Sequence, residues 1–277
     1  MFEAALQPLL QHPAPWFCCT LALFASFYMG FTRSALGAGG FVISPLIILA
    51  IGAKDGLAVL ATLMLVASAI SSWQHRKEVV WTLLSPLLFA AVVGTGLGGL
   101  ALWALVNSGE EADVEHNLEY VVGGLTLFYT VLIMLRARIA KGGPDRLPRW
   151  WETFCAGTAV GASQVVANSG SPMLTVFFVR FHQHKERFVA AQACFLGVQN
   201  LLKLAPLLLL GILHLGNFGT AVLLLPVLIV GGWAGALTYR KCSESSLFTI
   251  YIFSLVLGCI TSFVLIWGRD HFYQTLF

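Results

Sequence analysis

Two basic residues stand inside stretches of sequence that are otherwise apolar. Arg33 ends an apolar segment that begins near Trp16, and Lys203 is the only charged residue between Gln192 and Pro206. If these stretches span a membrane, each charge costs about 2.5–3.5 kcal/mol and should face the protein interior for a functional reason. Alternatively, the long side chains could reach the membrane surface, above all at Arg33, whose depth depends on where its helix bends. We interpret both cations as groups that neutralise a bound anion.

Lys203 belongs to a polar stripe on its segment. Gln192, Gln199 and Lys203 are spaced by seven and four residues, which places them on one face of an α-helix with Asn200 beside it. Amide side chains in membranes also form hydrogen bonds between helices, so this alternative stays open. We predict that the stripe lines a substrate path.

Two similar breaks interrupt the apolar segments. The first is Gly37-Ala-Gly39-Gly40-Phe-Val-Ile-Ser44-Pro45, and the second, 127 residues later, is Gln164-Val-Val-Ala-Asn168-Ser169-Gly170-Ser171-Pro172. In a membrane, irregular backbone must be buried in protein or line a cavity, because lipid offers no hydrogen-bond partner. Paired breaks in the two halves of a chain indicate the binding site of a transporter.

Each break ends in Ser-Pro, a pair that favours the start of a helix. Serine is a common N-cap, and proline suits the first helical position. Residues 45–52 would form only about 12 Å of helix, less than half the thickness of a membrane. We therefore expect helices that begin at Pro45 and Pro172 near the midplane and direct free N–H groups and a positive dipole end at a ligand.

The composition places these residues in a membrane protein. The chain of 277 residues is 58% hydrophobic and 10% charged, with a mean hydropathy of +0.82. Soluble domains carry about 25% charged residues. Apolar segments of about 20 residues favour helices over a β-barrel. Because no Lys or Arg precedes Trp16, we expect the first segment to be a retained helix rather than a cleaved signal peptide.

The chain divides into two similar halves. We predict a first transmembrane repeat over residues 1–136, a basic linker rich in Gly and Pro over 137–150, and a second transmembrane repeat over 151–277. Residues 30–45 and 157–172 have the same length, and each half contains five apolar segments. An odd number of segments makes the halves inverted in topology, as in many transporters.

Loop charges predict the orientation. The loop 107–117 carries four acidic residues and no Lys or Arg, so we place it in the periplasm. Of the 16 basic residues, 12 then fall in cytoplasmic loops, including the linker 137–150, as the positive-inside rule expects. The predicted fold is an all-α polytopic protein of the bacterial inner (plasma) membrane. Its two inverted-topology repeats each contain a discontinuous or re-entrant helix pair, and these pairs meet near the bilayer midplane.

The absence of certain residue types narrows the function. All 13 Asp and Glu lie in loops or at segment ends, and no histidine is in the middle of a span, so a cation carrier or a carboxylate proton relay is disfavoured. The six cysteines lack metal-ligand spacing, and no catalytic motif is present. We predict no enzyme activity, no cofactor, no metal and no nucleic-acid partner. The expected partners are the lipid bilayer and a small anion, and a homo-oligomer is left open.

One pattern suggests a family. The first half of the chain resembles the first repeat of the sulfite exporter TauE/SafE family. The resemblance rests on Gly-x-Gly-Gly, the apolar residues and Ser-Pro-Leu that follow it, a short apolar stretch to Gly52, and the run Ala58-Val-Leu-Ala-Thr62. The resemblance covers about residues 16–268. The second break departs from it, with Ala-Asn-Ser-Gly at 167–170 where the family often has consecutive glycines. The resemblance implies a carrier of sulfite or of an organosulfur anion such as sulfoacetate.

We therefore predict a transporter of a small sulfur-containing oxyanion, sulfite or an organosulfonate such as sulfoacetate, that works by alternating access. Missing acidic groups favour facilitated transport or proton movement on the substrate itself. A small-anion channel and a non-transport membrane scaffold are the alternatives. The predicted substrate-binding residues are Arg33, Gly39, Gly40, Ser44, Pro45, Asn168, Ser169, Gly170, Ser171, Pro172, Gln192, Gln199, Asn200 and Lys203.

Overall fold

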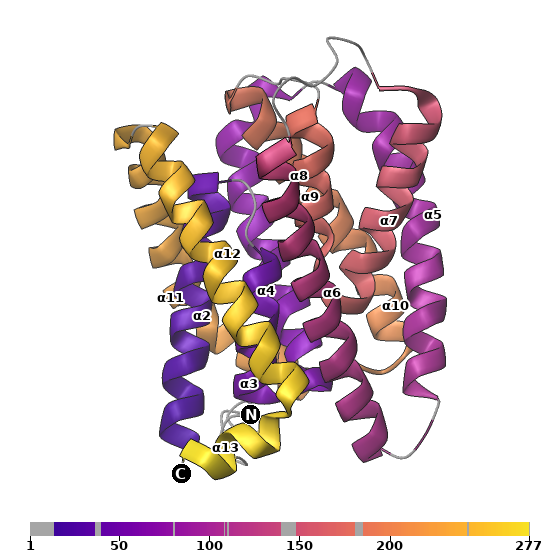
Figure 1. Ribbon diagram of the computed structural model, residues 1–277, viewed down its shortest axis with the longest axis vertical. Helices are drawn as coiled ribbons and strands as arrows, with labels where there is room; N and C mark the ends of the chain where they lie inside the picture. Colours follow the sequence, from indigo (N-terminus) through magenta and orange to yellow (C-terminus); the bar gives the residue numbers. More distant parts are fainter. Residues whose placement is uncertain are drawn as a thin grey trace.

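Figure 1 shows the computed structural model of the protein, which describes residues 14–36, 40–79, 81–107, 109, 111–139, 148–180, 185–242 and 244–276. These described residues form helices and no strand, which confirms the predicted all-α fold. In chain order the elements are α2 (Pro15–Leu36), α3 (Gly40–Ile51), α4 (Ala53–His75), η1 (Arg76–Glu78), α5 (Trp81–Val106), α6 (Glu111–Ile139), α7 (Trp150–Ala167), α8 (Gly170–Arg180), α9 (Lys185–Leu202), α10 (Leu204–Leu209), α11 (Leu215–Lys241), α12 (Glu244–Trp267) and α13 (Arg269–Leu276).

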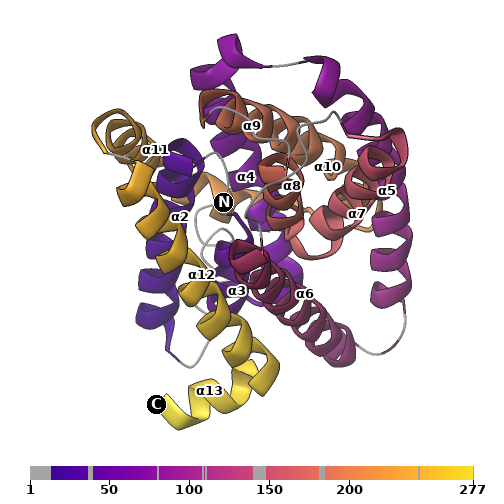
Figure 2. The same ribbon diagram turned by 45° about the horizontal axis from the view of Figure 1, so that its top comes forward.

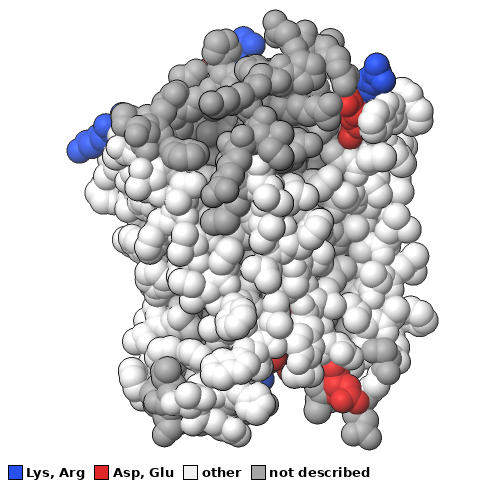
Figure 3. All heavy atoms as spheres, in the orientation of Figure 1, with Lys and Arg blue, Asp and Glu red and all other residues white. Residues whose placement is uncertain are grey.

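Within the described residues, six stretches of helix are long and apolar enough to cross a membrane. They are Pro15–Leu36, Ala53–Glu78, Leu84–Val106, Arg187–Leu209, Leu215–Lys241 and Thr249–Trp267. In Figure 3 the coloured charged side chains lie at the two ends of the molecule, with a broad uncharged band between them. Seven of the eight exposed tryptophans lie near helix ends, as in the aromatic belts of membrane proteins, and Trp233 lies within α11. The seven are Trp16, Trp73, Trp81, Trp103, Trp150, Trp151 and Trp267. The protein is therefore a multi-pass membrane protein.

Two long helix pairs form the flanks of the molecule. α2 packs along α11 on one side and α5 along α7 on the other, with α3, α4 and α8 between the pairs (Figures 1 and 2). Each pair needs glycine, because a Cβ on Gly231 of α11 would collide with the carbonyl of Phe27, and one on Gly94 of α5 with the carbonyl of Thr158. Both pairs join a helix of the first predicted half to a helix of the second, so the two halves interlock.

The short helix α3 lies in the interior. Every residue of α3 from Ile43 to Ile51 is buried, and the helix contacts α2, α4, α6, α8 and α12. Its sequence explains this position, since a helix that is apolar on all sides is stable only when protein or lipid surrounds it completely. The contact with α8 brings together the helices that follow the two breaks.

The helices after the breaks do not begin at Ser-Pro, so this prediction was wrong. α8 begins at Gly170, two residues before Pro172, and α3 begins at Gly40, five residues before Pro45. The first N–H groups of a helix have no intrahelical acceptor, so proline in the first turn of α8 loses no hydrogen bond. Pro45 stands inside α3 and removes one backbone hydrogen bond there. Glycine begins both helices, which places the turns before the Ser-Pro pairs.

Three predicted boundaries also differ from the structure. Residues 111–117 of the predicted acidic loop form the first turns of α6, where the positive end of the helix dipole favours carboxylates. α6 continues to Ile139, three residues into the predicted linker. α9 ends at Leu202, so Lys203 lies at its junction with α10. Pro206 accounts for this junction, because it has no N–H to donate to the Leu202 carbonyl.

Candidate functional site

Arg33 and Lys203 meet in the interior of the protein. Arg33 comes from the last turn of α2, Lys203 from the α9–α10 junction, and each side chain is only 1% exposed. Both contact the sulfur atom of Met64 in α4, at 3.7 Å from Arg33 Nη2 and 3.8 Å from Lys203 Nζ. The two cations are therefore close enough for their charges to repel each other. Neither side chain reaches the surface of the protein.

The contacts of these cations are with neutral groups. Lys203 Nζ donates a hydrogen bond to Asn168 Oδ1, and Arg33 Nε and Nη1 have no hydrogen-bond partner among the described residues. The buried carboxylates lie elsewhere: Glu119 pairs with Arg269 of α13. Glu152 accepts the backbone N–H of Arg149 at the start of α7. A buried charge without a counter-charge destabilises a protein by several kcal/mol. A bound anion would supply the counter-charge, so these two cations favour an anionic ligand.

A chain of amide groups holds the partner of Lys203 in place. Gln164 Nε2 donates to Asn168 Oδ1 at 3.4 Å and to Asn200 Oδ1 at 3.0 Å. Asn200 Nδ2 in turn donates to Ser68 Oγ at 2.7 Å and to the carbonyl of Met64 at 3.2 Å. The network connects the second break to α9 and α4.

The second break has a defined turn geometry. Asn168 follows α7 in the left-handed conformation, with φ 54° and ψ 21°, a region that Asn and Gly tolerate best. The N–H of Gly170 at the start of α8 donates to Gln164 Oε1 at 3.0 Å. Ser169 Oγ lies 3.0 Å from Thr126 Oγ1, whereas the buried Ser171 Oγ has no partner among the described residues. The first N–H group of α8 therefore binds a side chain of the protein.

The polar stripe on α9 divides into two parts. Asn200 and Lys203 belong to the network around the cations. Gln192 Nε2 donates to Thr175 of α8 and Gln199 Nε2 to Thr95 of α5, both at 2.6 Å, as interhelical hydrogen bonds. The four side chains of the stripe are buried, and the Oε1 atoms of the two glutamines have no partner among the described residues.

The first break contributes fewer observable contacts. Gly39 lies outside the described residues, and Gly40 is the first residue of α3. Ser44 is fully buried in that helix, directly before Pro45. On the preceding side of the break, the carbonyl of Arg33 accepts a hydrogen bond from Ser71 Oγ of α4 at 3.0 Å. The break is thus fixed to α4 close to Arg33.

Three residues of the cluster were not among the predicted site residues. Gln164 precedes Asn168 by four residues, a helical spacing that could have indicated their contact. Ser68 precedes Ser71 on the buried face of α4. Met64 carries no sequence signal, because it is one apolar residue in an apolar span.

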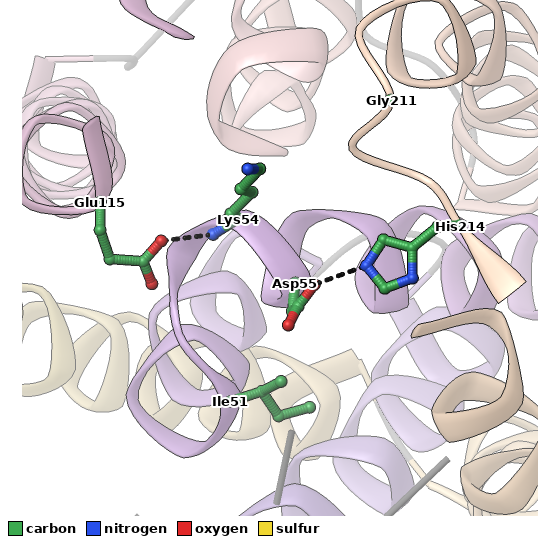
Figure 4. Close-up of a pocket in the computed structure, with 6 residues that line it drawn as sticks. All are labelled: Ile51, Lys54, Asp55, Glu115, Gly211 and His214. Carbon is green, nitrogen blue, oxygen red and sulfur yellow. Dashed lines mark hydrogen bonds and ion pairs between the residues drawn. The ribbon is translucent and has the colours of Figure 1, made fainter. Parts of the chain in front are cut away.

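A separate cavity of about 280 Å³ lies beside the α3–α4 turn (Figure 4). It is lined by Ile51, Lys54, Asp55, Glu115, Gly211 and His214. Glu115 accepts the backbone N–H of Ala53 and, at 3.1 Å, that of Lys54, and His214 Nε2 lies 3.2 Å from Asp55 Oδ1. These carboxylates hold the α3–α4 turn in place. No predicted site residue lines the cavity.

Membrane-spanning helices, broken helices that meet in the interior and a buried polar cluster at their junction are the features of a membrane carrier. The model of the family Sulfite exporter TauE/SafE matches residues 22–262, and the chain belongs to this family. The protein is thus a membrane transporter of the sulfite exporter family, as the Gly-x-Gly-Gly and Ser-Pro-Leu pattern predicts. No curated protein and no solved structure matches the chain.

Proposed function

We propose that the protein carries a small sulfur-containing oxyanion, sulfite or an organosulfonate such as sulfoacetate, across the membrane by alternating access. The observation that supports this best is the burial of Arg33 and Lys203 together, each 1% exposed and each with neutral contacts. An anion between them would offset the desolvation of both cations at once. A cation would add a third positive charge to the same cluster, so a cation permease is disfavoured.

The chemistry of the two cations suits an oxyanion. Arg33 offers a planar guanidinium whose N–H donors match the oxygen atoms of sulfite, sulfonate or carboxylate. Lys203 adds a compact charge with three donors. Ser171 Oγ, buried and without a partner among the described residues, is a further donor at the second break. These groups bind the negatively charged end of the cargo and do not select its organic part.

The helix pairing supports two inverted repeats. α2 and α7 are the first helices of the two halves, and each packs along the fourth apolar segment of the other half, α11 and α5 respectively. A two-fold axis in the membrane plane would exchange these pairs and place the two breaks opposite each other. Rocking of the repeats would then open the cluster to one side at a time.

Charge supports one orientation of the protein. The start of α6, which includes Glu115, lies at the opposite end of the molecule from most of the blue side chains visible in Figure 3. We assign the acidic end to the periplasm and the basic end, with the linker, to the cytoplasm of a bacterial cell.

The burial of the cations supports a carrier that occludes its cargo over a small-anion channel.

Transport into liposomes tests the proposal. Purified protein should take up labelled sulfite or sulfoacetate, and preloading the vesicles with the same anion should accelerate uptake, because a carrier exchanges and a channel does not. Lys203→Met should reduce uptake at least about tenfold, since the loss of one charged hydrogen bond costs more than 1.4 kcal/mol. Lys241→Met, at the exposed end of α11, is the matched control and should transport normally.

The alternatives predict different results. Uptake without acceleration by preloaded anion would identify a channel. A protein that moves neither anion, and in which Lys203→Met changes no anion-binding signal, would be a scaffold, and the proposal would be wrong.

A further inference from the structure

The sulfur atom of Met64 stands where an anion between the two cations would stand. It lies 3.7 Å from Arg33 Nη2 and 3.8 Å from Lys203 Nζ, so it contacts both cations at once. A thioether sulfur is a weak acceptor and carries no charge, so it satisfies the two donors poorly. Met64 is itself fully buried, and its side chain therefore occupies space that belongs to the cluster.

Asn168 fills the second position next to Lys203. Its Oδ1 accepts from Lys203 Nζ, and the same atom accepts from Gln164 Nε2 at 3.4 Å. Gln164 Nε2 also donates to Asn200 at 3.0 Å, so it keeps a partner if the Asn168 oxygen moves away. Like an oxygen of sulfite or of a sulfonate, the amide oxygen accepts a hydrogen bond from Lys203, but it carries no negative charge.

Both residues have a fixed main chain and a side chain that can move. The carbonyl of Met64 is held by Asn200 Nδ2 at 3.2 Å, while its unbranched side chain rotates about three bonds. The N–H of Asn168 donates to the carbonyl of Gln164 at 3.2 Å, which fixes the turn independently of the side chain. The side chains can therefore leave the cations without disturbing the break.

We propose that Met64 and Asn168 are internal ligands that satisfy Arg33 and Lys203 until an oxyanion displaces them. This inference rests on the proposed function of the same site. A carrier must also return without cargo, and two bare cations would make that step costly. Internal ligands lower this cost, and by competing with the anion they weaken its binding enough for release. Met64 and Asn168 thus set both the affinity of the site and the rate of the empty return.

Two variants test the proposal without disturbing the fold. Asn168→Gly keeps the left-handed turn, and Met64→Leu keeps the volume of the side chain but removes the sulfur. Asn107→Gly, at the exposed end of α5, and Met29→Leu, in the buried core of α2, are the matched controls. Equilibrium binding of labelled sulfite to the full-length protein in nanodiscs, net uptake and exchange are measured for each variant.

We expect Asn168→Gly to bind sulfite about tenfold more tightly, because a competing hydrogen bond to a charged group is lost. Met64→Leu should bind about threefold more tightly, as sulfur is the weaker acceptor. In both variants net uptake, which needs the empty return, should slow by a larger factor than exchange, which is slowed only by the tighter binding. The controls should behave as the wild type in all three measurements.

The results separate this inference from the proposed function. If the wild type binds and exchanges sulfite but the variants bind it equally or more weakly, Asn168 and Met64 are not internal ligands, and the inference alone is wrong. If net uptake and exchange fall by the same factor, the empty return is not affected by these residues and the inference is also wrong. If the wild type neither binds nor moves sulfite or sulfoacetate, both proposals fail.

Discussion

Arg33 Nη2 and Lys203 Nζ reach the same sulfur atom, although 170 residues of chain separate the two cations. Met64 lies between them on α4, the helix that also holds the carbonyl of Arg33 through Ser71. One cation precedes the first break, and the other donates to Asn168 in the second. The cluster therefore unites both halves of the chain at a position with no carboxylate partner among the described residues.

Lys203→Met should stabilise the protein although it reduces transport. Replacing a whole buried ion pair by apolar groups of similar volume is neutral or stabilises proteins by about 1–4 kcal/mol, and a buried cation without a counter-charge has less attraction to lose. The variant also ends the repulsion between Lys203 and Arg33. The melting temperature in the absence of sulfite should therefore rise, whereas Lys241→Met should leave it unchanged. A clear fall in melting temperature would show that Lys203 stabilises the fold.

The backbone conformation of Asn168 leads to a separate prediction about stability. Its φ of 54° lies in the left-handed region, which costs a residue such as alanine about 1–2 kcal/mol. Asn168→Ala should be less stable than Asn168→Gly by about that amount, although both lack the amide oxygen. Thermal unfolding of the two variants in the same detergent measures the difference. Equal stability would mean that the turn relaxes.

Two glycines of α5 should differ in their tolerance of alanine. A Cβ on Gly94 would meet the carbonyl of Thr158 in α7, whereas nothing lies within 4 Å of a Cβ on Gly96. Gly94→Ala should force α5 and α7 apart and cost about 1–3 kcal/mol, as overpacking typically does. Gly96→Ala should be neutral or slightly stabilising, because alanine has the higher helix propensity. Size-exclusion chromatography after graded heating compares the two proteins.

Orientation can be measured with single cysteines. In a variant without the six native cysteines, Gly109→Cys lies at the acidic end and Arg149→Cys at the start of α7. A membrane-impermeant thiol reagent added to spheroplasts should label the first and not the second. Inside-out vesicles should give the reverse pattern. The same labelling pattern in both preparations would contradict the assigned orientation.

Much of the architecture could be predicted from local sequence. Apolar length predicts the helices, because a membrane span has no other way to satisfy its backbone. The two breaks and the burial of Lys203 are local properties too, since a polar group in an apolar run must face protein. The Ser-Pro pairs were a poor guide to the helix starts. Pro172 lies within the first turn of α8, where proline costs no hydrogen bond, and Pro45 is accommodated inside α3 at the cost of one backbone hydrogen bond.

The sequence by itself determined that this protein crosses the membrane with broken helices and holds two cations away from lipid. Only the tertiary structure decided that Arg33 and Lys203 share Met64 and that Asn168 is the partner of Lys203. It also separated Gln192 and Gln199, which bond to neighbouring helices, from Asn200. The physical reason is that helix periodicity sets which residues share a face, whereas the packing of α2, α4, α7 and α9 sets which faces meet.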